Sequence, residues 1–254
     1  MTIRSLLYST LATYLSLICL NANAAAAEKL KPHFKAVAFD YFVIFNPNSV
    51  VSEVEKIFPG KGLEFTKAWR SKQFEYGFIR SITKRHADFF SVTGDALDYT
   101  AKASNLDLSP KARESLLNAY LNLKPWPDAI QSLKKLKEAG VRIITIANFS
   151  QKMLRSNAQN AGIVNLFDEL LSTEVNGTYK PDPMAYELGV KRLQLKKNEI
   201  VFAAFGGWDA YGAKNFGYPT YWVNRFGLPT EILGLEADHT SRDMSGLLDF
   251  VFNR

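Results

Sequence analysis

The stretch KAVAFDYFVIFNPNSV, residues Lys35 to Val50, decides how the rest of the chain is organised. Residues 35–42 are nearly all apolar, which is typical of a strand buried on both faces of a parallel sheet. Asp40 lies near the C-terminal end of this run, the end at which open α/β sheets bind ligands. A carboxylate there needs a cationic or hydrogen-bond-donating partner. The common alternative is an Asp that only caps the following turn.

The segment after this strand has helical spacing and no convincing strand from residue 49 to about 127. The apolar positions predict helices over residues 51–58, 65–83, 86–103 and 110–123. Ser109 before Pro110 is a typical helix start. We therefore predict an all-helical cap domain over residues 47–125, inserted between the first strand and the rest of the chain.

From Trp126 onward the pattern alternates between helix and strand. Strands are expected over residues 141–147, 166–172, 200–204 and 220–223. Between them lie helices that end at Gly140, span residues 150–162, begin at Asp182 and span residues 208–216. Such alternation predicts an α/β fold with a doubly wound parallel sheet, built from residues 33–46 and 126–254.

The N-terminal residues 1–27 have the pattern of a secretory signal peptide. Arg4 precedes an apolar segment at 6–20, and Ala22-Asn23-Ala24 offers a small-residue cleavage site. We expect a secreted or periplasmic mature protein that is not membrane-bound after cleavage. The apolar segment is short for a membrane span, but an uncleaved anchor is the alternative.

Charge and cysteine content narrow the class of protein further. The net charge is +6, and removing residues 1–24 leaves 30 Lys and Arg against 25 Asp and Glu, or +5. These charges are spread along the chain, which favours a small anionic substrate over nucleic acid. Cys19 is the only cysteine and lies in the signal, so the mature chain has no disulfide and no cysteine catalysis.

Four polar residues fall at the ends of predicted strands or in the loops that follow them. Asp40 and Asn148 follow the strands at 35–42 and 141–147; the other two are Lys180 and Asp209. Because the carboxyl ends of parallel strands share one edge of the sheet, we expect all four side chains at one crevice.

Several segments together resemble the haloacid dehalogenase superfamily, and more narrowly the type II (L-2-haloacid) dehalogenases. They are WRSKQFEY (69–76), YKPDPMAYELG (179–189), GGWDAYGAKNFGYP (206–219) and WVNRFGLP (222–229). The resemblance covers nearly the whole mature chain. It implies a Rossmann-type core with a helical cap, a homodimer formed through that cap, and hydrolysis without metal or organic cofactor.

The resemblance also implies catalytic roles. Asp40 would displace the halide from carbon and form an ester, which water then hydrolyses. Lys180 would keep Asp40 ionised and oriented, and Asp209 would position Lys180 and help to activate the water. Arg70 in the helical cap would act with them as a catalytic residue.

Substrate and halide contacts are implied for further residues. Arg70, Asn148 and Phe89 would cradle the departing halide. Tyr186 would donate a hydrogen bond toward the nucleophile or the substrate, and Trp208 would form a wall of the pocket. For Asn148, Phe89, Tyr186 and Trp208, packing without a role in binding is an equal alternative.

Phe42 occupies the position two residues after the nucleophile. Phosphatases of the superfamily carry a second Asp there as general acid, together with Mg²⁺. A halide leaving group needs no proton, so Phe42 fits carbon–halogen displacement better than phosphoryl transfer.

The chain also departs from the dehalogenase pattern at four polar positions. The affected residues are Val43-Ile44, which replace a Gly-Thr with one residue fewer, and Ala147, Ala204 and Gly206. Each missing donor lowers the rate by roughly ten- to a thousand-fold. The backbone N–H groups near Tyr41, Phe42 and Phe149 are candidate replacements.

Three hypotheses follow. The first is a hydrolytic dehalogenase of short 2-haloalkanoic acids, with its nucleophile, lysine, arginine and second acid all in place. The second is an exported binding protein that kept the fold but has reduced or lost catalysis, which the missing polar groups would explain. The third is a magnesium phosphatase, against which Phe42 argues.

Overall fold

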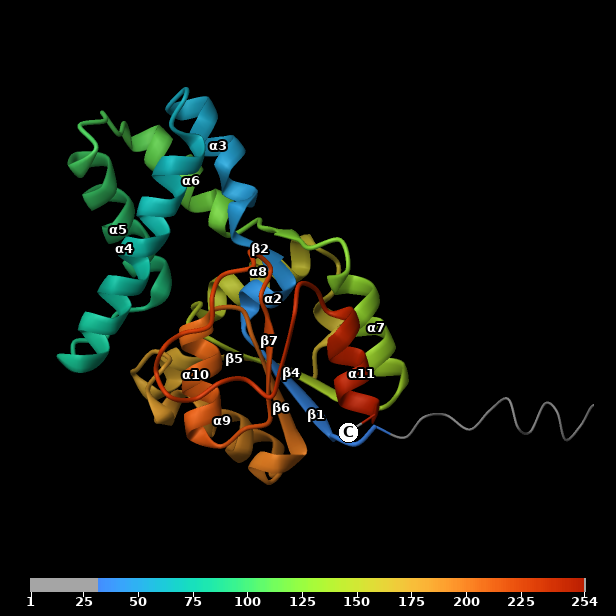
Figure 1. Ribbon diagram of the computed structural model, residues 1–254. Helices are drawn as coiled ribbons and strands as arrows, with labels where there is room; N and C mark the ends of the chain where they lie inside the picture. The colour runs from blue at the N-terminus through green and yellow to red at the C-terminus, as the bar shows by residue number, and fades with distance from the viewer. Residues whose placement is uncertain (1–31, 254) are drawn as a thin grey trace, which may run out of the picture. The chain divides into compact units, whose positions relative to one another are not determined.

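Six parallel strands form the central sheet, in the order β5-β4-β1-β6-β7-β8 (Figure 1). The structure is a computed structural model that describes residues 32–253. The strands are β1 (Ala36–Phe39), β4 (Arg142–Ala147), β5 (Glu169–Ser172), β6 (Ile200–Ala204), β7 (Thr220–Val223) and β8 (His239–Ser241). Strand β1 lies between β4 and β6, with every neighbouring pair parallel. The predicted doubly wound α/β fold is therefore confirmed.

Helices cover both faces of this sheet, and β1 explains why. Val37 and Phe39 pack into one hydrophobic cluster with α7, α8 and α11, whereas Ala36 and Ala38 pack into a second cluster with α9 and α10. The helices are α7 (Ala129–Glu138), α8 (Gln151–Asn160), α9 (Pro183–Leu193), α10 (Gly207–Phe216) and α11 (Ser245–Asn253). Figure 1 shows α7 and α11 on one side of the sheet and α9 and α10 on the other. A strand buried on both faces carries apolar side chains at every position.

A group of four helices lies between β1 and β4 in the sequence. They are α3 (Val51–Ile57), α4 (Gly62–Ile82), α5 (Phe89–Ala103) and α6 (Pro110–Tyr120), and we call them the helical cap. Their interior is centred on Trp69, whose ring packs edge-on against Tyr120 at 4.7 Å between centroids. The Trp69 indole N–H donates to the carbonyl oxygen of Thr93 at 2.8 Å, so α4, α5 and α6 share one buried core.

A short antiparallel ribbon carries the chain into and out of the helical cap. It pairs β2 (Phe45–Asn46) with β3 (Lys124–Pro125). The prediction that no strand occurs between residues 49 and 127 is therefore wrong for β3. A strand of two residues leaves no periodic pattern, because its pairing with β2 depends on distant residues.

The first predicted strand is shorter in the structure than in the sequence analysis. Strand β1 ends at Phe39, and Tyr41–Ile44 form a short helix, α2, instead of continuing the strand. All four residues of α2 are buried, so the apolar run alone does not separate a strand from a buried helical turn. Strand β8 and helix α11 were not predicted.

Four 3₁₀ helices complete the described elements: η1 (Pro47–Val50), η2 (Val164–Leu166), η3 (Thr173–Asn176) and η4 (Lys197–Glu199). Between residues 32 and 253, none of the helices combines the length and the hydropathy needed to cross a bilayer. The predicted signal peptide, residues 1–27, lies outside the described residues.

Candidate active site

Asp40 is the first residue after β1, and its carboxylate has two hydrogen-bond partners. The backbone N–H of Phe42 donates to Asp40 Oδ1 at 2.8 Å, and Lys180 Nζ donates to Asp40 Oδ2 at 2.7 Å. Asp40 thus caps α2 and also pairs with a distant lysine, so it does more than cap the following turn. About a tenth of its side chain, 12%, stays exposed, which leaves the carboxylate open to one side.

Lys180 lies in the loop before α9, and its side chain is fully buried. Its ammonium group donates to Asp40 Oδ2 and to Asp209 Oδ2, both at 2.7 Å. The backbone N–H of Lys180 donates to Asn148 Oδ1 at 2.8 Å, and Thr173 Oγ1 donates to the same oxygen at 3.2 Å. Asn148 therefore holds the lysine loop against the end of β4, which fixes where the ammonium group lies.

Asp209 lies in the first turn of α10 and is completely buried. Burial raises the pKa of the Asp209 carboxyl to about 6, against the opposing effect of the Lys180 charge. The pKa of Lys180 is also raised: burial lowers it, but the charges of Asp209 and Asp40 outweigh that effect. Lys180 is therefore charged at neutral pH and holds two carboxylates together.

Tyr186 lies on α9, where its hydroxyl donates to Asp209 Oδ1 at 2.7 Å. It is fully buried and packs edge-on against Phe202 rather than facing the pocket. The prediction that Tyr186 donates toward the nucleophile or the substrate is therefore wrong. The sequence placed Tyr186 in the right helix, but the register of α9 turns it toward Asp209.

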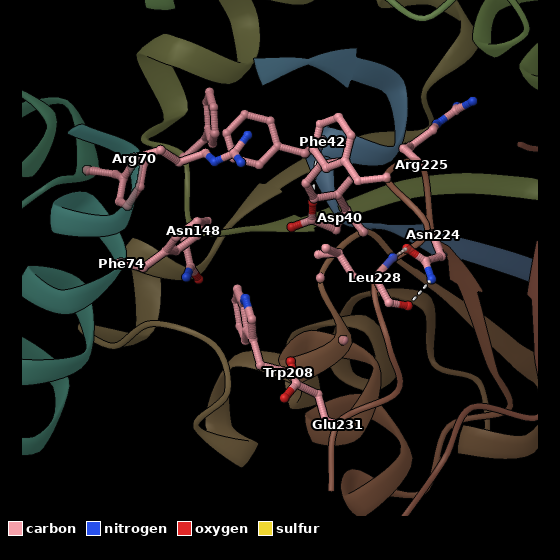
Figure 2. Close-up of a pocket in the computed structure, with 16 residues that line it drawn as sticks. Asp40, Phe42, Arg70, Phe74, Asn148, Trp208, Asn224, Arg225, Leu228 and Glu231 are labelled. Carbon is pink, nitrogen blue, oxygen red and sulfur yellow. Dashed lines mark hydrogen bonds between the residues drawn. The ribbon is translucent and has the colours of Figure 1, made fainter. Parts of the chain in front are cut away.

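The exposed side of Asp40 opens into a cavity of about 150 Å³ between the sheet edge and the helical cap (Figure 2). Seven aromatic side chains line it: Phe42, Phe74, Phe89, Phe149, Phe205, Trp208 and Phe226. The polar side chains lining it are Asp40, Arg70, Asn148, Asn224, Arg225 and Glu231. Lys180 and Asp209 lie behind Asp40 and do not line the cavity, so Asp209 makes no direct contact with this space.

Two arginines line this pocket, and they differ in their partners. Arg225 donates to Asp128 Oδ1 at 2.7 Å and to the carbonyl oxygen of Val43 at 2.8 Å. Arg70, on α4, has a buried Nη1 without any hydrogen-bond partner, and its guanidinium lies 5.6 Å from the centre of the Phe226 ring. Burial lowers the pKa of Arg70, which shows that its charge is poorly solvated. Arg70 is therefore positioned to receive an anion.

Six residues predicted for the site do line the pocket: Asp40, Phe42, Arg70, Phe89, Asn148 and Trp208. The sequence analysis named Phe149 only for its backbone N–H and gave no role to the group Asn224, Arg225 and Phe226, which follows β7. This group lies within the segment WVNRFGLP. Its place after a strand end was the signal that could have identified it.

The four positions at which the sequence departs from the expected polar pattern carry no polar side chain in the structure. Ala147 and Ala204 are completely buried, and so are Val43 and Ile44 in α2. Of the candidate backbone replacements, the Phe42 N–H donates a hydrogen bond to Asp40 Oδ1. Gly206 lines the pocket without offering a side chain.

Within residues 32–253, no three His, Cys, Asp or Glu side chains lie close enough together to hold a metal ion. The carboxylates of Asp40 and Asp209 instead share the Lys180 ammonium group. The site is thus a buried Asp–Lys–Asp chain whose first carboxylate opens to an aromatic pocket.

Comparison with known proteins places this arrangement in a family. The profile of the haloacid dehalogenase-like hydrolases matches residues 32–217. The (S)-2-haloacid dehalogenase of Pseudomonas sp. (strain YL) is 39% identical over 207 residues, which cover 81% of this chain and 89% of that protein. Haloacetate dehalogenase H-2 of Moraxella sp. (strain B) is 34% identical over 218 residues, or 85% of this chain and 97% of that protein.

A solved structure agrees with the sequence comparisons. The L-2-haloacid dehalogenase from Xanthobacter autotrophicus with chloropropionic acid covalently bound is 31% identical and superposes with a TM-score of 0.81. The match covers 87% of this chain and 99% of that structure. The chain therefore belongs to the haloacid dehalogenase-like hydrolases.

Proposed function

We propose that this protein hydrolyses the carbon–halogen bond of short (S)-2-haloalkanoic acids through an ester formed on Asp40. One observation carries the proposal: Asp40 is held by a buried ammonium group on one side and opens to an aromatic pocket on the other. A carboxylate in so apolar a pocket is poorly hydrated, which makes it a stronger nucleophile.

The relatives support this choice of substrate. Two curated relatives carry the names (S)-2-haloacid dehalogenase and haloacetate dehalogenase. The Xanthobacter autotrophicus structure with covalently bound chloropropionic acid supports a covalent intermediate for the present chain as well.

The reaction has two steps. In the first, a carboxylate oxygen of Asp40 attacks C2 of the substrate, the carbon–halogen bond breaks with inversion, and the halide leaves with the bonding electrons. In the second, water adds to the ester carbonyl of Asp40, and the ester C–O bond breaks to release the 2-hydroxy acid. The products are one halide ion, one hydroxy acid and one proton, and Asp40 is regenerated.

Three charged residues, Arg70, Lys180 and Asp209, have different roles in this reaction. Arg70 receives the leaving halide, because its Nη1 lacks any other partner and Asn148 and Phe89 line the same cavity. Lys180 orients Asp40, and its ammonium group already pairs with both carboxylates, which supports a metal-independent reaction. Asp209 acts through Lys180.

The test is halide release from a panel of short 2-haloacids, with Asp40→Asn as the comparison. We expect release by the natural protein and none by Asp40→Asn, since the amide is a much weaker nucleophile. Equal rates in the two proteins would refute the proposal.

A second candidate is an exported binding protein that retains the pocket but not the turnover. Ala147 and Ala204 favour it, because these residues end strands β4 and β6 and offer no side-chain donor there. Tight binding of a halide-free acid with no turnover of any haloacid would support it. A phosphatase is disfavoured because Phe42, not an acid, lines the pocket beside Asp40.

Export and assembly complete the proposal. We propose cleavage after the Ala22-Asn23-Ala24 segment and a secreted or periplasmic mature protein, which N-terminal sequencing of the protein from each cell fraction would test. We also propose a homodimer through the helical cap, which sedimentation would test; a monomer at micromolar concentration would contradict it.

A further inference from the structure

We propose that the indole N–H of Trp208 binds the carboxylate of the substrate and is the donor by which the pocket selects an acid. This inference rests on the proposed function. It begins from a chemical need: a 2-haloacid brings a carboxylate and a departing halide into one pocket, and each anion needs a donor.

Most polar groups that line the pocket already have partners. The Asn224 amide exchanges hydrogen bonds with the backbone of Leu228, and Arg225 is bound to Asp128 and Val43. The Asn148 amide oxygen accepts from the lysine loop, and its nitrogen donates to the carbonyl oxygen of Lys180 at 3.4 Å. Among the described pocket residues, these bonds leave the Arg70 guanidinium, Arg225 Nε and Trp208 Nε1 as side-chain donors without a protein acceptor.

The position of the Trp208 ring is fixed from the helical cap. The ring lies edge-on to Phe74, with 5.5 Å between centroids, and to Phe78, at 5.4 Å. Figure 2 shows the Trp208 side chain rising from α10 toward the space that Arg70, Asn148 and Asp40 surround. Two aromatic neighbours restrict the ring to few orientations, so its N–H is presented without a large loss of entropy on binding.

Gly206 makes this orientation possible. A Cβ atom on Gly206 would lie 2.7 Å from Trp208 Nε1, closer than real Cβ atoms approach, and 3.1 Å from Cδ1, which is a tight contact. The indole N–H thus fills the place that a side chain at position 206 would take. The departure noted at Gly206 therefore leaves room for the Trp208 indole, and the pocket has a donor at that point.

The start of α10 adds to the same effect. Gly206 and Gly207 line the pocket, and no side chain caps the N-terminus of this helix. A carboxylate next to the Trp208 N–H would therefore also lie near the positive end of α10. With Arg70 across the cavity, the pocket offers separate places for the carboxylate and the halide.

The kinetic test uses Trp208→Phe, which keeps an aromatic ring and removes the N–H. For 2-chloropropionate we expect KM to rise by about tenfold or more, as for loss of a hydrogen bond to a charged group. For 2-chloropropionamide, which has no charge, we expect little change in KM. A loss that is equal for acid and amide would show a packing role only and would overturn the inference.

Two further variants control this measurement. Trp222→Phe removes an indole N–H that already donates to the carbonyl oxygen of Phe205, and Trp222 does not line the pocket. We expect it to leave the ratio of the two KM values unchanged. Gly206→Ala places a methyl group against the Trp208 indole nitrogen, and we expect it to raise the KM for the acid as Trp208→Phe does.

A binding test separates this inference from the proposed function. The indole ¹H resonance of Trp208, identified by its absence in Trp208→Phe, should move downfield with propionate but not with propionamide. Such a shift without halide release from any haloacid would uphold the inference and refute the dehalogenase. Halide release with no propionate-specific shift would refute the inference alone.

Discussion

The two sides of Asp40 differ in their chemistry. On the buried side, Lys180 and Asp209 form a chain of charged hydrogen bonds, with Tyr186 bonded to Asp209. On the open side, seven aromatic side chains surround the cavity. The buried side fixes the direction of the Asp40 carboxylate. The open side keeps water away from it and leaves few donors, so each remaining donor has a large effect.

The largest effect is expected on the buried side. Lys180→Met would leave two buried carboxylates facing each other without a cation, which should lower the free energy of unfolding by about 3–5 kcal/mol and abolish halide release. Denaturant unfolding at pH 7 measures the loss. The control is Lys191→Met, which breaks the exposed pair with Glu187 and should cause only a small fraction of that loss.

On the open side, the largest effect is expected for Arg70. Arg70→Met removes the guanidinium whose Nη1 lacks a partner, and we expect kcat/KM for 2-chloropropionate to fall by about a hundredfold. Inhibition by added chloride should weaken in parallel. Arg80→Met is the control on the same helix, since Arg80 pairs with Asp95 outside the pocket. An unchanged chloride inhibition in Arg70→Met would contradict the halide role.

Protonation of Asp209 on the buried side is expected to change the reactivity of Asp40 toward the open side. Burial raises the pKa of Asp209 to about 6, so its carboxyl gains a proton as the pH falls below that value. Lys180 would then neutralise Asp40 alone, and the nucleophile would weaken. We expect kcat/KM to fall about tenfold per pH unit below about pH 6. In Asp209→Asn this acid limb should disappear; an identical limb in that variant would assign the titration to another group.

The smallest effect is expected at Glu231, whose carboxylate lines the pocket and repels an anionic substrate. Glu231→Gln should lower the KM for 2-chloropropionate by about twofold at low salt, and less at high salt. Glu236→Gln, in the same loop but not lining the pocket, should leave KM unchanged. A KM that rises in Glu231→Gln would mean that this carboxylate assists binding.

The sequence was most informative where chemistry and strand ends coincide. The sequence analysis placed Asp40, Lys180 and Asp209 at one crevice. Lys180 is 140 residues from Asp40 and 29 from Asp209, and the structure joins all three through its ammonium group. The fold followed from the alternation of apolar strands with amphipathic helices, which depends on local spacing.

The sequence was less informative where tertiary contacts decide the outcome. The apolar sequence of residues 41–44 is compatible with a buried strand and with a buried helical turn. The Asp40 side chain accepts a hydrogen bond from the Phe42 N–H, and this cap selects the turn. The direction of Tyr186 depends on the register of α9 against β6, and the two-residue strand β3 depends on β2. No pattern within a short window records these contacts.

The most direct test of the central claim is a mass spectrum of the Asp40 peptide after brief mixing of the protein with 2-chloropropionate. We predict that this peptide gains the mass of a propionate ester, that Asp40→Asn shows no such gain, and that turnover in H₂¹⁸O places ¹⁸O in Asp40. Halide release with an unmodified Asp40 peptide and no ¹⁸O at Asp40 would show that water attacks the substrate directly, and would contradict the account.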